Sequence, residues 1–240
     1  KTVLPKVNDV ETNVGVAGVD TGYILEWDFR KGADKNVTAG GRGWVGIKDP
    51  ENDYNPDGSN AGTGITSAQV SYIDDYLDDC DAKLFGSGFA GSNGWRSCID
   101  EASAVDYYIG MELMKPVDGN MWASVYMYKP RGDKLRFGPL WDFDLSSGSA
   151  AREGNTVSSS GWYLRNQIST SAKQSSVTWF NRLNQDPDFT NAVKARWNEV
   201  YPNLSSTAFI DGQVSLMSQS VTENFKKWSI KERISNAQII

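Results

Sequence analysis

The amino-acid sequence predicts an α+β fold, because strand-like and helix-like segments follow one another without the regular alternation that builds a parallel sheet. Short runs rich in Val, Ile, Trp and Tyr come first, an amphipathic helical region follows, and then come a hairpin and further helices. Hydrophobic residues make up 39% and aromatic residues 12% of the 240 residues, which indicates a globular chain with an aromatic core. We therefore expect one domain over residues 1–240, mainly helical, with short antiparallel strands and a β-hairpin.

The amino-terminal part predicts strands followed by one helix. Strand-like runs between glycines cover Val14–Asp28 and Arg42–Lys48, and the stretch 49–64 is rich in Asp, Asn, Gly and Pro, as loops are. Thr66 and Gln69 then form a capping box at the start of a helix. The apolar residues that recur there at steps of three and four are Val70, Ile73, Leu77, Cys80 and Leu84. The acidic residues expected on the solvated side are Asp74, Asp75, Asp78 and Asp79.

The remaining elements are a second helix, a hairpin and two later helices. The second helix is expected over Asp100–Met114, and Pro116 ends it. Its inward residues are expected to be Val105, Tyr108, Ile109 and Leu113. Strands over Ser124–Tyr128 and Lys134–Phe137 flank a Pro-Arg-Gly-Asp turn and predict a hairpin. The later helices open at Asp186-Pro187 and at Ser206.

The composition excludes several kinds of chemistry. The chain has no histidine, which removes Ser-His-Asp and Cys-His catalysis and every His-ligated metal. It has two cysteines, Cys80 and Cys98, which are too few for a thiolate zinc site or an iron–sulfur cluster. A disulfide between them would contribute about 3 kcal/mol. Two cysteines alone do not decide whether the compartment is oxidising.

Charge and hydropathy point away from two classes of partner. The net charge is −6 with no basic block, which argues against binding to nucleic acid. No apolar run reaches the roughly 18 residues that a membrane span needs. The run Asp53–Gly58 matches the first half of a calcium-binding loop, but Gly64 stands where a Glu ligand is required. We interpret this run as a turn.

Two aspartates after the hairpin are the strongest candidates for chemistry. They lie in the run Trp141-Asp142-Phe143-Asp144-Leu145. If this run is extended, its three apolar side chains pack inward, and Asp142 and Asp144 share the other face, roughly 6–7 Å apart. Such a pair is either a solvated strand face, a site for a hard cation, or the acid pair of a glycoside hydrolase.

A third aspartate, Asp118, follows the second predicted helix in the loop 115–120. Aspartate before a glycine is common in turns, so its simplest role is structural. Together with Asp142 and Asp144, however, it gives three carboxylates around one hairpin. That arrangement suits a Mg²⁺ or Ca²⁺ site for phosphoryl transfer, in which a further Asp orients the attacking hydroxyl.

Around these aspartates the chain resembles the spore coat protein H (CotH) kinase-like family. The most specific segment is Gly-Pro-Leu-Trp-Asp-Phe-Asp-Leu at 138–145, preceded by the Tyr-rich run Ser124–Lys129. The resemblance covers most of the chain. Its other segments are Thr21–Asp28, Ile47–Glu51, the helix with Gln69, Tyr72 and Ile73, Ile99-Asp100, Tyr107–Ile109, Glu112-Leu113, Asp118, Asp186–Phe189 and Arg196-Trp197.

The resemblance implies an atypical protein-kinase-like fold that uses ATP and a divalent cation, Mg²⁺ or another such as Ca²⁺ or Mn²⁺. It implies phosphorylation of Ser and Thr hydroxyls of proteins outside the cytosol, at the cell or spore surface. By resemblance, Asp118 is the catalytic acid near the substrate hydroxyl, Asp142 and Asp144 are metal ligands, and Trp141 shapes the nucleotide pocket. The phosphate-contacting lysine of the family's amino-terminal half has no counterpart here. We therefore expect the carboxy-terminal portion of the domain, which would lack full ATP binding without the missing amino-terminal segment.

A hypothesis from a different class is a non-catalytic surface or carbohydrate-associated binding module on the same scaffold. Nine tryptophans offer platforms for sugar rings, although those at helical spacing, such as Trp197 and Trp228, are expected in the core. A two-carboxylate glycosidase is the weakest hypothesis, because Asp142 and Asp144 would share a strand face instead of flanking a groove. Nucleotide binding and glycan binding distinguish the first two hypotheses.

Overall fold

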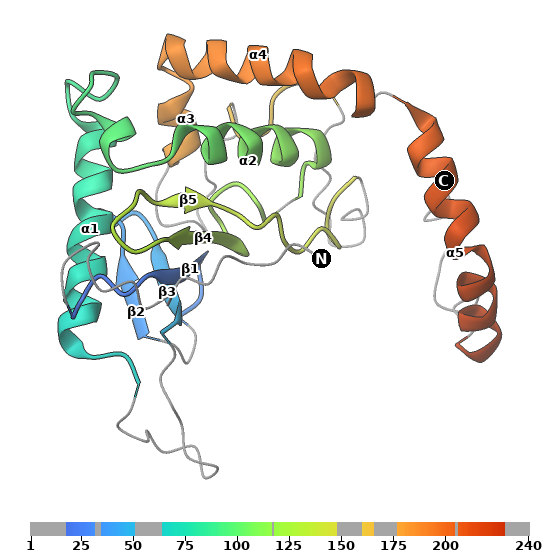
Figure 1. Ribbon diagram of the computed structural model, residues 1–240, viewed down its shortest axis with the longest axis horizontal. Coiled ribbons are helices and arrows are strands. Elements are labelled where there is room, and N and C mark those ends of the chain that lie inside the picture. Colours follow the sequence, from blue (N-terminus) through green and yellow to red (C-terminus); the bar gives the residue numbers. More distant parts are fainter. Residues whose placement is uncertain are drawn as a thin grey trace. The chain divides into compact units, whose positions relative to one another are not determined.

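The computed structural model (Figure 1) describes residues 18–31, 35–50, 64–116, 118–147, 160–165, 177–204 and 206–228. Across these residues it contains five α-helices, a short 3₁₀ helix and one five-stranded antiparallel sheet, which confirms the predicted α+β class. The chain divides into two compact units, Lys1–Val193 and Lys194–Ile240. The first unit holds the sheet, the buried core and the three candidate aspartates.

The sheet has the strand order β2-β3-β1-β4-β5, and each neighbouring pair is antiparallel. Its strands are β1 (Tyr23–Asp28), β2 (Lys35–Thr38), β3 (Trp44–Asp49), β4 (Val125–Lys129) and β5 (Arg136–Phe137). Burial alternates along β1 and β4, as expected for strands with one face on a core. The predicted hairpin is confirmed as β4 and β5, whereas β2 is a strand that the sequence pattern did not indicate. The start of the first predicted strand run, residues 14–17, lies outside the described residues.

The first helix, α1 (Ser67–Phe85), begins where the capping box predicts. The Gln69 backbone N–H donates to the Thr66 hydroxyl oxygen at 3.2 Å, and the Thr66 N–H donates to Gln69 Oε1 at 2.9 Å. Four of the five predicted inward residues are fully buried, namely Ile73, Leu77, Cys80 and Leu84. Satisfied donors at the first turn and a continuous apolar stripe together explain why this segment is helical.

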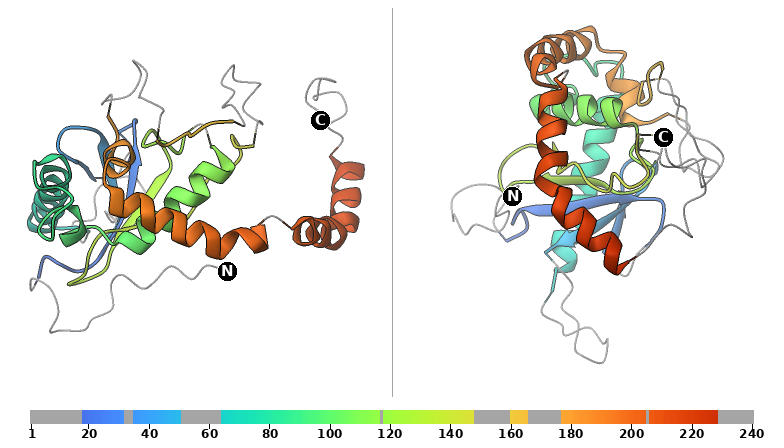
Figure 2. Two further views of the ribbon diagram at one scale, coloured as in Figure 1. Left: turned by 90° about the horizontal axis from the view of Figure 1, so that it is seen from above. Right: turned by 90° about the vertical axis from the view of Figure 1, so that its right-hand side faces the viewer.

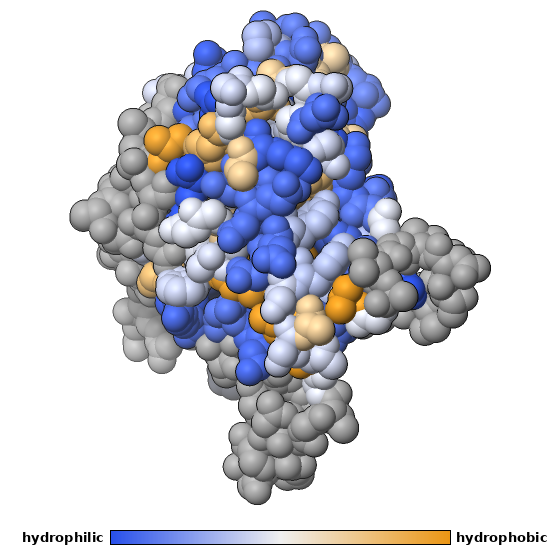
Figure 3. Space-filling view, turned by 90° about the vertical axis from the view of Figure 1, so that its left-hand side faces the viewer, coloured by the Kyte–Doolittle hydropathy of each residue, from blue (hydrophilic) through white to orange (hydrophobic). Residues whose placement is uncertain are grey.

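Two aspartates on the acidic side of α1 accept hydrogen bonds from the backbone at the β2 edge of the sheet. Asp74 accepts a hydrogen bond from the Thr38 N–H at 3.1 Å, and Asp78 accepts one from the Gly40 N–H at 2.8 Å. The helix therefore lies against the β2 edge, and the left view of Figure 2 shows it end-on beside the strands. The left-hand side of the molecule in Figure 1, where α1 lies, is mostly hydrophilic on its outer surface (Figure 3).

Two further helices complete the core of the first unit. The helix α2 (Glu101–Met114) begins at Asp100, whose carboxylate accepts from the Ser103 N–H, and ends before Pro116 as predicted. Its predicted inward residues Val105, Tyr108 and Ile109 are buried, whereas Leu113 is 49% exposed, so that prediction is wrong. The short helix α3 (Trp179–Leu183) places three fully buried side chains against the sheet and α1, which are Trp179, Phe180 and Leu183.

The last two helices are α4 (Pro187–Leu204) and α5 (Thr207–Lys227), and they begin where the sequence predicts. Phe189 near the start of α4 is fully buried. The Ser206 hydroxyl caps α5 by accepting from the Ala208 N–H at 3.3 Å. Trp228 just after α5 is 62% exposed, so its predicted place in the core is wrong. Helical spacing identifies an apolar face but not the surface that covers it.

Candidate phosphotransfer site

The loop after α2 carries Asp118 and is fixed to the end of β1. The backbone N–H groups of Trp122 and Ala123 donate to the Asp118 carbonyl oxygen at 3.3 and 3.1 Å. The Phe29 N–H in turn donates to the Trp122 carbonyl oxygen at 2.8 Å. The Phe29 and Trp122 rings stack with centroids 4.1 Å apart and an interplanar angle of 9°. These contacts set the position of the Asp118 backbone.

Asp142 follows β5 and is held at the open end of the hairpin, next to the start of β4. The Gly138 N–H donates to the Tyr126 carbonyl oxygen at 2.9 Å, and the Trp141 ring meets the Tyr126 ring edge-on at 5.7 Å. The Ser124 hydroxyl donates to Asp142 Oδ2 at 3.0 Å. Because Ser124 directly precedes β4, the segment entering the hairpin orients the carboxylate that follows it.

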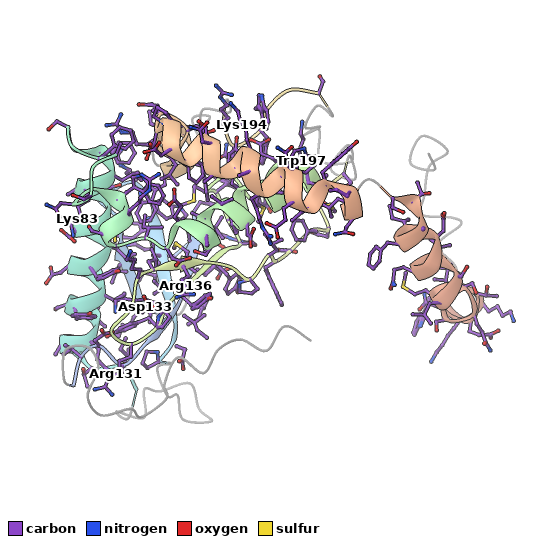
Figure 4. The ribbon with its side chains drawn as sticks, turned by 45° about the horizontal axis from the view of Figure 1, so that its top comes forward. Lys83, Arg131, Asp133, Arg136, Lys194 and Trp197 are labelled. Atoms are coloured by element: carbon purple, nitrogen blue, oxygen red, sulfur yellow. The ribbon has the colours of Figure 1, made fainter. Side chains whose placement is uncertain are left out.

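The turn of the hairpin is anchored by a buried ion pair. Lys129 Nζ lies 2.7 Å from Asp20 Oδ1, and both side chains are 2% exposed. Asp20 Oδ2 also accepts from the Gly132 N–H at 2.8 Å. Beyond the turn, Arg136 Nη2 pairs with Asp133 Oδ2 at 2.7 Å, and Figure 4 labels both residues. The hairpin that lies between Asp118 and Asp142 in the sequence is thus held by contacts at its turn and at its open end.

The three candidate aspartates interact electrostatically. Partial burial raises the pKa of the Asp118 carboxyl above its ordinary value, and the charges of Asp142 and Asp144 raise this pKa further. The Arg30 guanidinium opposes this rise in the pKa of Asp118, and Asp28 adds to it. Arg30 forms a two-point ion pair with Asp28, with Nε–Oδ1 at 3.0 Å and Nη2–Oδ2 at 2.9 Å. The Asp118 carboxyl therefore lies within electrostatic range of the two other candidate aspartates, Asp142 and Asp144.

The backbone around this site is strained. Among the described residues, every non-glycine residue with positive φ lies between positions 115 and 147, and these residues are Lys115, Met121, Ser124, Asp142 and Ser147. A left-handed conformation costs an L-residue roughly 1–2 kcal/mol. Residues held in such conformations cluster at functional sites, where the surrounding structure imposes a geometry that the chain would not adopt alone.

The structure corrects the expectation that the run 141–145 is extended with its aromatic residues inward. Asp142 has φ 62°, which breaks the alternation of side chains along the run. Trp141 is 55% exposed and does not pack inward. Asp142 and Asp144 are both exposed, as predicted, but they do not share the face of a regular strand.

Three further residues lie near the candidate aspartates and were not chosen as site residues from the sequence, although two of them fall in segments that resemble the family. They are Asp28, Arg30 and Ser124. The spacing of Asp28 and Arg30 at the end of a strand is typical of a local side-chain-to-backbone turn, and the Arg30 N–H does donate to Asp28 Oδ1 at 2.7 Å. Nothing in that spacing indicates proximity to Asp118. The calcium-like run 53–58 lies outside the described residues.

The carboxylates of this site suit a hard cation, such as Mg²⁺, that is bound partly by the protein and partly by the phosphate groups of a substrate. Within the parts of the chain that the structure describes, no group of three or more His, Cys, Asp or Glu side chains lies close enough to ligate one ion. Mg²⁺ is usually held by one or two protein carboxylates together with water and substrate phosphate oxygens. The exposed carboxylates of Asp142 and Asp144 match that mode better than a cage built from protein alone.

Comparison with known proteins gives a family for the chain. The family model described as CotH kinase protein matches residues 11–239, which include every helix and strand described above and the three aspartates. Neither the comparison with curated proteins nor the comparison with solved structures gives a match. None of the helices in the described ranges has the length and apolar character needed to span a bilayer. The chain therefore belongs to the CotH kinase family of kinase-like proteins.

Proposed function

We propose that the protein is a divalent-cation-dependent kinase that transfers the γ-phosphoryl group of ATP to a Ser or Thr hydroxyl of a protein at the cell or spore surface. The observation that supports this proposal is the electrostatic effect of Asp142 and Asp144 on Asp118, in a region where the segments before and after one hairpin contain residues with left-handed backbone. Membership of the CotH kinase family supports the kinase-like reaction. The roles that we assign to individual residues come from the resemblance to the family and are supported by the chemistry of their side chains.

Asp118 is the group that we assign to the acceptor hydroxyl. In kinases an aspartate accepts the proton of the attacking hydroxyl and orients its oxygen. Partial burial and two neighbouring carboxylates raise the pKa of Asp118, which brings its basicity closer to the working pH. The contacts of the loop hold the Asp118 backbone in place, which limits the positions that the carboxylate can take beside the hydroxyl.

Asp142 and Asp144 are the groups that we assign to the cation. The Ser124 hydroxyl donates a hydrogen bond to Oδ2 of Asp142 and so orients this exposed carboxylate. When bound, a divalent cation neutralises phosphate charge during transfer. Repulsion among the three carboxylates raises the pKa of Asp118, and a bound positive charge offsets that repulsion.

Trp141 is the group that we assign to the adenine ring. Its indole is 55% exposed and contacts the Tyr126 ring edge-on, so a flat ligand can stack on the exposed part of the indole. The same exposure supports the second candidate function, a carbohydrate-binding module, because sugars also stack on exposed indoles. Trp162 is similarly open, at 52%.

Calorimetric titration of Mg·ATP into the wild-type protein and the Asp142→Asn variant tests the proposal. We expect the variant to bind at least about tenfold more weakly, which corresponds to about 1.4 kcal/mol, with an unchanged circular dichroism spectrum. Asp75→Asn is the matched control, because it removes the same charge from an exposed position of α1.

A second variant separates nucleotide binding from phosphoryl transfer. Asp118→Asn is expected to keep Mg·ATP affinity while losing transfer of labelled phosphate to a Ser/Thr peptide library. Unchanged Mg·ATP affinity in Asp142→Asn would refute the assigned metal ligand. Binding of an oligosaccharide without binding of Mg·ATP would favour the carbohydrate module.

A further inference from the structure

The only two cysteines of the chain meet in the core of the first unit, although neither belongs to the proposed site. Cys80 lies on α1 and is 0% exposed, and Cys98 follows the 3₁₀ helix Trp95–Ser97 and is 2% exposed. Both are free thiols in this structure, and Cys98 is among the groups that act on the Cys80 thiol, so the two side chains are neighbours. Figure 1 shows the chain turning back beside the end of α1 before α2 begins.

The backbone around the pair is fixed by neighbouring contacts. Tyr76 is one helical turn before Cys80 on the same face of α1, and its hydroxyl donates to the Cys98 carbonyl oxygen at 2.7 Å. The same hydroxyl accepts from the Leu135 N–H at 3.2 Å, just before β5. The Cys98 thiol contacts the Trp95 carbonyl oxygen at 3.4 Å. These contacts hold the Cys98 segment against the face of α1 that carries Cys80.

We propose that Cys80 and Cys98 form a disulfide that links α1 to the segment before α2, and that this bond forms before the core closes. A thiolate of one cysteine attacks a disulfide oxidant such as glutathione disulfide and forms a mixed disulfide. The second thiol then displaces the remaining glutathione. In total two protein thiols and one glutathione disulfide give one protein disulfide and two glutathione thiols, so two electrons pass from the pair to the oxidant.

Burial determines when this exchange occurs. In the folded protein neither sulfur is accessible to a dissolved oxidant, and burial raises the pKa of the Cys80 thiol and so keeps it protonated. Exchange therefore takes place in the unfolded or locally opened chain. The same burial protects the finished bond from dissolved reductants.

The test refolds the whole chain either with a mixture of oxidised and reduced glutathione or with a phosphine reductant. Each sample is then denatured, treated with N-ethylmaleimide and weighed by mass spectrometry. We expect no maleimide adduct after oxidative refolding and two adducts after reductive refolding. The oxidised form should also melt about 6–12 °C higher than the reduced form, given the stabilisation typical of a short disulfide loop.

The variants Cys80→Ala and Cys98→Ala are the controls, and in each of them the redox-dependent shift of the melting temperature should vanish. Two adducts after oxidative refolding would overturn the proposal, and so would disulfide-linked dimers in place of an internal bond. Equal melting temperatures for the two wild-type forms would overturn the stabilising role. If either variant fails to fold, the adduct count on the wild-type chain still decides.

Discussion

Replacing Lys129 by methionine removes the charge of the buried ion pair at the hairpin turn while nearly keeping the side-chain volume. Lys129 Nζ lies 2.7 Å from Asp20 Oδ1 and is also within 4.9 Å of the Tyr76 ring centroid. A pair of unit charges at that separation attracts with about 6 kcal/mol at an effective dielectric constant of 20. The methionine also avoids the cost of burying the ammonium, which offsets part of that loss. Removing one partner of a buried ion pair therefore lowers the free energy of unfolding by about 3–5 kcal/mol.

The assay is thermal and urea unfolding followed by circular dichroism. A loss of 3–5 kcal/mol lowers the melting temperature of a chain of this size by about 6–20 °C. The matched control is Lys134→Met, because Lys134 is an exposed lysine of the same hairpin. Adding Asp20→Asn to Lys129→Met should recover part of the loss, since the buried carboxylate is then no longer charged. If Lys129→Met is as mild as Lys134→Met, the reasoning about the buried pair is refuted.

Three further outcomes follow from the same structure. Gly40→Ala should lower the free energy of unfolding by about 2–4 kcal/mol, because φ is 56° there and the added Cβ would lie 2.1 Å from a carboxylate oxygen of α1. Gly88→Ala is the control, because a Cβ at Gly88 would meet open space, and it should leave the urea unfolding curve nearly unchanged. Asp118→Asn should raise the melting temperature at neutral pH. Because the folded-state pKa of Asp118 is raised, ionisation of its carboxyl opposes folding above that pKa. The difference in melting temperature between the variant and the wild type should therefore shrink as the pH falls towards the ordinary aspartate pKa. A difference that grows on acidification would contradict this reasoning. Ser124→Ala should weaken Mg·ATP binding about fivefold, because it removes one hydrogen bond to Asp142. Unchanged affinity in calorimetry would show that this hydrogen bond does not orient the Asp142 carboxylate for binding.

Local signals in the sequence predict the elements whose ends are set by local chemistry. The capping box at Thr66 and Gln69 marks the start of α1, and the N-cap Asp100 marks the start of α2. The Pro-Arg-Gly-Asp turn likewise marks the hairpin. In each case the residues that satisfy the backbone donors or bend the chain lie within a few positions of one another, so their spacing in the sequence is informative.

Features that depend on distant parts of the chain could not be predicted in this way. The edge strand β2 is four residues long, and it is fixed by Asp74 of α1, which accepts from the Thr38 N–H. Asp142 has a positive φ and accepts a hydrogen bond from Ser124, which lies 18 positions earlier, and Trp141 is exposed. Arg30 reaches the neighbourhood of Asp118 only because β1 ends beside that loop.

The candidate acidic residues could be chosen from the sequence, and their roles stay predictions, whereas the backbone geometry around them could not be predicted. Asp118, Asp142 and Asp144 could be selected because carboxylates around a hairpin are chemically distinctive, and the resemblance to the CotH family added their roles. The alternation expected of an extended run failed, because one residue with left-handed backbone reverses the side-chain pattern after it. Sequence patterns describe regular backbone, and this site is built from irregular backbone.

The central claim is that Asp118, Asp142 and Asp144 surround one metal–nucleotide site. The most direct measurement is a crystal structure with Mn²⁺ and a non-hydrolysable ATP analogue, in which anomalous scattering locates the metal. We expect the metal peak about 2.2 Å from a carboxylate oxygen of Asp142 or Asp144, with the γ-phosphate of the analogue between the metal and Asp118. A metal peak or a nucleotide bound away from these three residues would contradict the claim.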